Sequence, residues 1–224
     1  MTTIIFLDID DRSVAKNSEK RNADKPEAIT CKIVKIVYTE PMSSQKLNLG
    51  CGKHILPGYV NLDISALPGV DVVHDIEKLP LPFPNNHFEE ILCQDVLEHV
   101  EYIPVLRDLH RILMPGGRLV IRVPHFTSHF NFVDPTHAKR FSIQTFDFFV
   151  KGASGEHDRS YYFDFSFSAC SSTKILFDHG SPVFFYNYFV EPLVNLSPRM
   201  QRIYEATFLS RLFPALNILV TLIK

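Results

Sequence analysis

A glycine-rich loop between two apolar runs is the part of this 224-residue chain best suited to hold a ligand. Residues 46–53 read Lys-Leu-Asn-Leu-Gly-Cys-Gly-Lys, so a strand-type segment ends in two glycines. Glycines there let the backbone turn sharply and approach a ligand with no Cβ in the way. The next apolar run ends in Asp63, whose carboxylate can accept two hydrogen bonds from a ribose diol. The pattern favours a nucleotide-like cofactor lying across the carboxyl ends of adjacent parallel strands.

The same loop argues against a dinucleotide. Gly-x-Gly also occurs in ordinary tight turns, and a dinucleotide fingerprint needs a third glycine, which packs a helix whose N-terminus holds the pyrophosphate. That third glycine is absent after Gly52, and Pro57 followed by Gly58 interrupts any helix within about two turns. The loop can therefore cradle a ligand that has no pyrophosphate, which disfavours NAD and FAD.

A second set of reactive side chains lies in residues 124–141, where three His, an Asp, a Lys and an Arg alternate with Phe. This mixture suits an enclosed polar site better than a core. His137 and Asp134 are expected to act as a general base and its orienting partner toward an acceptor hydroxyl or amine. Arg140 is expected to hold an anionic group of the substrate.

Two other interpretations of this segment stay open. The sequence Asp-Pro-Thr-His at 134–137 also makes a good turn and helix cap. A metal site is the second, because His125, His129, Asp134 and His137 supply nitrogen and oxygen ligands for zinc or another divalent ion. No metal is expected as the first choice, since helical spacing and cysteine ligands are both lacking.

The segment from Leu47 to Pro124 resembles the class I S-adenosylmethionine-dependent methyltransferases, in particular the small type 11 domains. The resemblance covers about a third of the chain, and its motifs recur in order. These are the glycine loop, Asp63, the third strand Val72–Ile76, the lead-in and fourth strand at 79–92, the stretch Gln94–His99, and the Pro-Gly-Gly turn into strand five at 113–121. One departure is the short gap from Gly52 to Asp63, so the family's first helix is expected to be a loop or a single turn.

The resemblance implies that S-adenosylmethionine is the cofactor. It places the methionine part at the glycine loop, the ribose at Asp63 and the adenine at the third strand and beyond the fourth. The implied cofactor-binding residues are Leu49, Gly50, Cys51, Gly52, Asp63, Ile64, Asp75, Ile76, Gln94 and Leu97. Cys51 is interpreted as a small apolar spacer and not as a nucleophile. Asp75 has an alternative role as a helix N-cap. Glu98 has the alternative interpretation of a residue on a solvated helix face, with no part in the site.

Length and composition fit one globular domain. Hydrophobic residues make up 46% of the chain, enough for a sizeable core, and a formal net charge of −2 leaves no electrostatic footprint for nucleic acid. The four cysteines share no close pair spacing, so reduced thiols in a cytoplasmic protein are expected. The apolar stretch 208–223 is interrupted by Arg211, Pro214 and Asn217, so it fails as a membrane span.

Alternating strands and helices predict an α/β, Rossmann-like methyltransferase fold: a mostly parallel sheet with an antiparallel edge strand and helices on both faces. The first four strands are expected at 46–50, 59–63, 71–74 and 88–93, then a helix at 95–113 that restarts near Ile103, with Pro104 in a first turn or a kink. Strands at 118–123 and 216–223, an aromatic strand at 161–167 and a helix at 199–212 complete the prediction. Residues 1–40 are expected to form an N-terminal arm with an edge strand at 31–38, and residues 41–224 the domain, with an acceptor-side insertion at about 125–195.

The expected function is methyl transfer from S-adenosylmethionine to a hydroxyl or amine of a small-molecule or glycan-like acceptor. In-line displacement at a methyl carbon needs little acid–base help, so positioning and water exclusion should dominate catalysis. The alternative is a non-catalytic S-adenosylmethionine-binding or regulatory domain, which would not need the polar loop at 125–140. A nucleotide-sugar or NAD-dependent enzyme is a third option, disfavoured by the missing glycine.

Overall fold

The computed structural model of the chain describes residues 45–152 and 162–224. All of these lie in one compact unit, residues 40–224. The predicted N-terminal arm at 1–40 and its edge strand at 31–38 fall outside the described residues, as does the first residue of the predicted aromatic strand.

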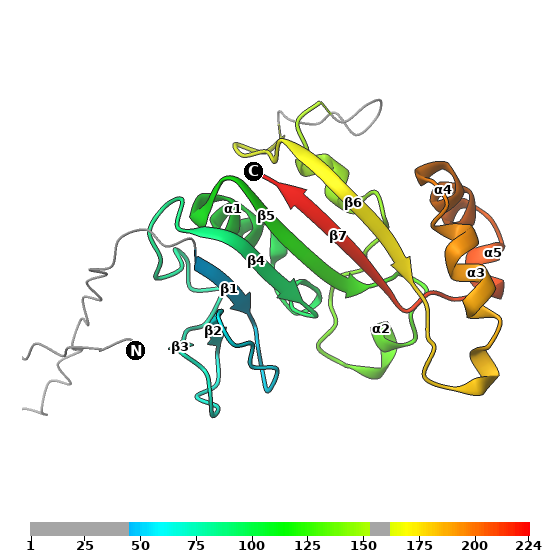
Figure 1. The fold of residues 1–224 in the computed structure, drawn as a ribbon, viewed down its shortest axis with the longest axis horizontal. Helices are drawn as coiled ribbons and strands as arrows, with labels where there is room; N and C mark the ends of the chain where they lie inside the picture. Colours follow the sequence, from blue (N-terminus) through cyan, green and yellow to red (C-terminus); the bar gives the residue numbers. More distant parts are fainter. Residues whose placement is uncertain (1–44, 153–161) are drawn as a thin grey trace, which may run out of the picture. The chain divides into compact units, whose positions relative to one another are not determined.

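One seven-stranded sheet organises the described residues, in the order β3-β2-β1-β4-β5-β7-β6 (Figure 1). Strands β1 to β5 pair in parallel, while β7 is antiparallel to both β5 and β6. Their bounds are β1 Gln45–Leu49, β2 Val60–Asp63, β3 Val72–Val73, β4 Phe88–Gln94, β5 Leu113–Pro124, β6 Ala169–Leu176 and β7 Asn217–Ile223. The predicted Rossmann-like fold class is confirmed, with the antiparallel strand β7 one place in from the edge strand β6.

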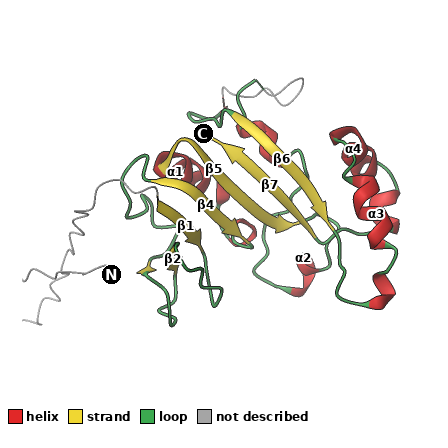
Figure 2. Cartoon of the chain, viewed as in Figure 1, coloured by secondary structure: helices red, strands yellow, loops and turns green. Residues whose placement is uncertain are grey.

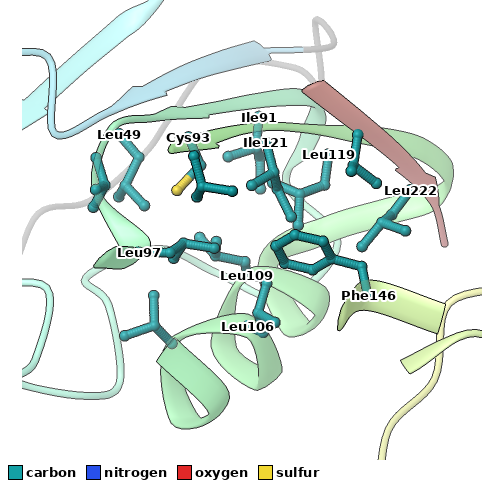
Figure 3. Close-up of a cluster of buried hydrophobic side chains, with 14 of the residues drawn as sticks. Leu49, Ile91, Cys93, Leu97, Leu106, Leu109, Leu119, Ile121, Phe146 and Leu222 are labelled. Carbon is teal, nitrogen blue, oxygen red and sulfur yellow. The ribbon is translucent and has the colours of Figure 1, made fainter. Parts of the chain in front are cut away.

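The core lies between the sheet and helix α1, Tyr102–Ile112 (Figure 3). On the helix, apolar residues three or four apart make one buried face, while the strands present every second side chain to it. Leu106 and Leu109 of α1 point toward Ile91 and Ile121 of the central strands. Phe146, from the 3-10 helix η2 at Thr145–Phe149, extends this core toward β7.

The helix predicted at 95–113 is divided in two. A short 3-10 turn, η1 at Leu97–His99, follows β4 directly, and α1 begins at Tyr102. Pro104 lies in the first turn of α1, where its missing N–H costs no helical hydrogen bond, as the sequence analysis expected. The break places η1 as a separate element at the carboxyl end of β4.

The expected absence of a helix after the glycine loop is confirmed, because only turns connect β1 to β2. Among the described helices, α1 packs on one face of the sheet. The helices α3 Asn187–Val194, α4 Pro198–Ala206 and α5 Leu209–Leu212 gather beyond β6 (Figure 2). Two short helices complete the set, α2 at Phe130–Val133 and the 3-10 turn η5 at Pro182–Phe184.

Two further predicted elements differ from the structure. The aromatic segment ending at Phe167 is not a strand in its described part, apart from a single bridge between Val150 and Phe167, and the strand β6 follows it instead. Its rings pack into a cluster in which Phe163 and Phe165 contact Phe149, so their alternation reflects side-chain packing and not strand pairing. The helix predicted at 199–212 is interrupted at Thr207 and Phe208, between α4 and α5.

Within residues 45–152 and 162–224, no helix combines the length and the apolar character that crossing a membrane requires. The cysteines of these residues, Cys51, Cys93 and Cys170, are free thiols.

Candidate cofactor and acceptor site

The glycine loop turns away from β1 in a conformation that suits glycine. Gly50 and Gly52 both have positive φ angles, +63° and +50°, which L side chains rarely adopt. A Cβ on Gly50 would lie 2.5 Å from Cγ2 of Val96, whereas one on Gly52 would meet nothing within 4 Å. The loop therefore packs closely against the segment that precedes η1, and Gly50 is the position where a side chain has no room.

Asp63 ends β2 beside this loop. Its Oδ2 accepts a hydrogen bond of 2.8 Å from the backbone N–H of Gly52, and its Oδ1 accepts one of 2.9 Å from Ser65. A carboxylate oxygen can accept more than one hydrogen bond, so both oxygens keep capacity for a diol. Ile64, the next residue, is 66% exposed and free to cover a flat ring.

Asp75 and Ile76 follow β3 as expected, but in a turn and not in a helix. The Oδ1 of Asp75 accepts a hydrogen bond of 3.1 Å from the backbone of Glu77, so the carboxylate caps this turn. The helix N-cap considered for Asp75 is therefore absent, because no helix follows this residue. Ile76 is half-buried against the core.

The remaining residues implied for the cofactor differ in their burial. Gln94 ends β4 and is half-buried, whereas Leu49, Cys51 and Leu97 are buried. Figure 3 shows the side chain of Leu97 within the core, above α1. Burial, followed by the negative charge of Asp63, raises the pKa of the Cys51 thiol, which agrees with its interpretation as a spacer.

His137 and Asp134 lie together beyond the carboxyl end of β5. The Nε2 of His137 is 3.8 Å from Oδ2 of Asp134, and only 8% of the His137 side chain is exposed. Thr136 donates a hydrogen bond of 2.6 Å from Oγ1 to Oδ1 of Asp134, and its backbone N–H donates another to the same oxygen. These two bonds, the first the larger in effect, hold the pKa of Asp134 below its usual range, so the carboxylate is ionised.

Arg140 faces the backbone of the same loop. Its guanidinium donates hydrogen bonds to the carbonyl oxygens of Asn131, His137 and Lys139. It also lies over the ring of Phe132, with 5.4 Å between Cζ and the ring centroid. In this structure the guanidinium holds the backbone of the loop, so an anionic substrate group would have to bind a guanidinium that already has these partners.

The four residues considered as an alternative metal site do not come together. His125 is fully buried beside β5, where its ring bonds Thr127 at 2.6 Å and Glu205 at 3.1 Å. His129 is exposed at the start of α2. Among the described residues, the potential metal ligands that come together include His137 but neither of these two histidines.

Sequence reasoning missed Glu98 and His99 as site residues, although it had matched the stretch that contains them. Glu98 is 0% exposed, and neither of its carboxylate oxygens has a hydrogen-bond partner. His99 lies edge-to-face against His137, with 4.6 Å between the ring centroids. The sequence does show an acidic residue beside a histidine soon after a buried strand. It does not show that Glu98 is buried.

Contacts between these elements join the two halves of the site. The backbone N–H groups of Ala138 and Lys139 donate to the carbonyl oxygen of Glu98 at 2.9 and 3.3 Å, which ties the polar loop to η1. Val96, directly before η1, contacts Gly50. The stretch from β4 into η1 therefore contacts the glycine loop on one side and the polar loop on the other.

A cavity of about 450 Å³ lies at the opposite end of the sheet, lined among others by Lys46, Glu90 and Arg118. These residues begin β1, β4 and the main part of β5, so the cavity faces the amino ends of the strands. Ligands of open α/β sheets bind at the carboxyl ends. None of the residues predicted for the site lines this cavity.

Comparison with known proteins agrees with this architecture. Residues 47–121 match the family model described as a methyltransferase domain. A demethylmenaquinone methyltransferase of Listeria welshimeri is 32% identical over 87 residues, which cover 34% of this chain and 36% of that protein. An uncharacterised protein of Methanocaldococcus jannaschii is 47% identical over 45 residues, 20% of each chain. The matched parts thus span only a fifth to about a third of these relatives' own length.

Among solved structures, an S-adenosylmethionine-dependent methyltransferase of Archaeoglobus fulgidus aligns with a TM-score of 0.51 and 17% sequence identity. The alignment covers 82% of this chain and 87% of that one. At this level of identity, the similarity shows the fold.

Proposed function

We propose that this chain, whose residues 47–121 match a methyltransferase-domain family model, is a class I S-adenosylmethionine-dependent methyltransferase that transfers a methyl group to a hydroxyl or amine of a small-molecule or glycan-like acceptor. One observation carries the proposal. The stretch from Val96 to Glu98 contacts both the glycine loop and the polar loop after β5, so a cofactor site and an acceptor site adjoin.

The residues on the cofactor side fit S-adenosylmethionine. A side chain at Gly50 would collide with Val96, so glycine at this position keeps the loop packed against the segment that precedes η1. The carboxylate of Asp63 suits the ribose hydroxyls, and Ile64 is free to cover the adenine. When bound, S-adenosylmethionine supplies an electrophilic methyl group on a positively charged sulfur.

The residues on the acceptor side position the nucleophile and take its proton. His137 is the general base in this proposal, and the ionised Asp134 orients its ring and stabilises the protonated form. Arg140 holds the loop that carries both residues. Most of the rate should come from placing the acceptor atom in line with the methyl group and from excluding water.

The alternative is a regulatory domain that binds the cofactor without catalysis. The clustering of His99, His137 and Asp134 around the buried Glu98 argues against it, because unpartnered polar groups cost stability unless they serve a function. A domain without catalysis would gain stability by replacing them with apolar residues.

Isothermal titration calorimetry of the purified chain tests the cofactor half of the proposal, with S-adenosylmethionine, S-adenosylhomocysteine and NAD as separate ligands. We expect the first two to bind and NAD not to bind. Methyl-labelled S-adenosylmethionine with a panel of hydroxyl and amine acceptors then tests transfer. Binding of NAD alone would refute the proposal, and binding of S-adenosylmethionine with no transfer to any class of acceptor would favour the regulatory alternative.

A further inference from the structure

Glu98 is the most unusual polar residue of the described chain. Its side chain is fully buried and neither carboxylate oxygen has a partner, which for a carboxyl group is a costly arrangement. No donor of the described residues reaches either oxygen, so a charged carboxylate here lacks a partner in contact with it. A missing partner of positive charge would resolve this.

Two histidines present ring nitrogens to the same place. One atom from each of Glu98, His99 and His137 lies within 4.8 Å of the others. The Nδ1 of His137 is buried and has no hydrogen-bond partner, while its Nε2 faces Asp134 at 3.8 Å. One nitrogen of this ring is therefore directed to a carboxylate and the other is unused.

The tautomer of His99 follows from its neighbours. Its Nδ1 is 2.7 Å from Oγ1 of Thr136, and that hydroxyl donates its proton to Asp134. Thr136 must then accept from His99, so Nδ1 carries the hydrogen and Nε2 keeps a lone pair.

We propose that Glu98, His99 and His137 form a binding site for a divalent transition metal, zinc in the first instance. Two histidines and one carboxylate, with further positions left open, are a donor set of catalytic zinc and related sites. Ligand atoms about 2.1 Å from zinc lie at most about 4 Å apart, so the three side chains need to close in only slightly. Thr136 supplies an outer hydrogen bond that orients His99, and the carboxylate of Asp134 lies 3.8 Å from Nε2 of His137.

This site differs from the set of histidines that the sequence suggested. It takes His137 from the polar loop but recruits Glu98 and His99 from η1, so the contact between η1 and the loop creates it. It deepens the proposed function, on which it rests only for the role of the metal, and in the metal-bound protein His137 is a ligand and no longer the general base. A metal beside the cofactor site would bind an oxygen or nitrogen of the acceptor, and oxygen-rich acceptors such as sugars fit such a site.

Metal binding by the untagged full-length chain tests the proposal without an activity assay. After treatment with EDTA and its removal, calorimetry with Zn²⁺ should show one ion per chain, and elemental analysis should confirm it. Mg²⁺ should bind at least about tenfold more weakly, because nitrogen ligands favour zinc. Glu98→Gln keeps the shape of the side chain and removes the charge, so it should fold and lose at least about tenfold in Zn²⁺ affinity.

His137→Ala provides a second variant with the same expected loss, and His129→Ala is the matched control, because this exposed histidine of the same loop lies outside the cluster. Circular dichroism and S-adenosylhomocysteine affinity report whether each variant folds. Zinc binding that Glu98→Gln and His137→Ala leave unchanged would overturn the metal site, as would absence of binding to the wild type. Failure of the wild type to bind S-adenosylhomocysteine would instead overturn the proposed function, so the two failures are distinguishable.

Discussion

The backbone N–H of Gly52 donates a hydrogen bond of 2.8 Å to Oδ2 of Asp63, which joins the glycine loop to the tip of the neighbouring strand. The backbone N–H of Cys51 reinforces this connection by donating to the carbonyl of Leu62 at 3.0 Å. The residue predicted to bind the ribose therefore also shapes the loop predicted to hold the methionine part. Changes at Asp63 should act on both parts of the cofactor.

Asp63→Ala should lower the affinity for S-adenosylhomocysteine at least about tenfold while the fold is retained. The substitution removes the ribose acceptor and releases the N–H of Gly52, and a hydrogen bond to a charged group is worth about 1.5–3 kcal/mol. Calorimetry with S-adenosylhomocysteine measures the loss. Lys53→Ala, at an exposed position of the same loop, is the control and should bind normally. Equal affinities for the two variants would contradict the assignment of Asp63.

Gly50→Ala and Gly52→Ala should separate backbone strain from steric exclusion. Both positions have positive φ, so each substitution should cost about 1–2 kcal/mol of stability from strain alone. Only at Gly50 would the new Cβ also meet Val96, at 2.5 Å, so the loop would have to move away from the segment before η1. We expect Gly50→Ala to be the less stable variant in urea unfolding and the weaker binder of S-adenosylhomocysteine. Normal binding by a folded Gly50→Ala protein would make the loop an ordinary turn.

Glu90 should make stability depend on pH at the acid end. Although burial opposes it, hydrogen bonds from Tyr59 and Arg118 and the positive charges of Arg118 and Lys46 lower the pKa of Glu90. The unfolded chain then binds the proton more readily than the folded one, so stability is present above the ordinary pKa near 4.5 and declines as the pH falls below it. Glu90→Gln should remove this part of the decline.

Urea unfolding between pH 3 and pH 7 measures the effect. At pH 7 the Glu90→Gln variant should be less stable than the wild type by about 1–3 kcal/mol, the worth of hydrogen bonds to a charged group, and the difference should shrink toward pH 3. Glu89→Gln is the matched control, since the Glu89 carboxylate is more exposed than that of Glu90 and its contact with Lys46 is long, at 4.0 Å. A difference that stays constant with pH would show that Glu90 acts through shape and not through charge.

Sequence patterns were sufficient for the parts of the fold that rest on local rules. Apolar runs that end in glycine or aspartate predicted β1 and β2 to within a residue or two, and the short gap after Gly52 predicted the missing helix. Pro104 located the restart of the helix after β4. In each case a single residue type restricts the backbone, so the sequence itself carries the constraint.

The errors arose where tertiary contacts decide. The alternating aromatics before Phe167 looked like a strand, yet their rings cluster around Phe149, which is distant in the sequence. The burial of Glu98 likewise depends on how the loop after β5 folds over η1, with Ala138 donating to its carbonyl oxygen. Periodicity reports which side chains share a face, but it does not report what covers that face.

His137→Ala should separate the acceptor site from the cofactor site. Its ring faces Asp134 and His99, neither of which belongs to the residues implied for the cofactor. We therefore expect S-adenosylhomocysteine affinity within about twofold of the wild type, together with a loss of methyl transfer of about 10²-fold or more, whether the ring takes a proton or holds a metal. Calorimetry gives the first quantity, and transfer from methyl-labelled S-adenosylmethionine to an acceptor that the wild type modifies gives the second.

Asp134→Asn extends this test, because it keeps the shape of the turn and removes the charge that orients His137. Its methyl transfer should fall by less than that of His137→Ala, since the base itself remains. The two variants should therefore show that methyl transfer depends more on the ring of His137 than on its orienting partner Asp134. A His137→Ala protein with full activity would leave residues 134–137 with the structural role of a capped turn, and a loss of cofactor affinity alone would move His137 to the cofactor side.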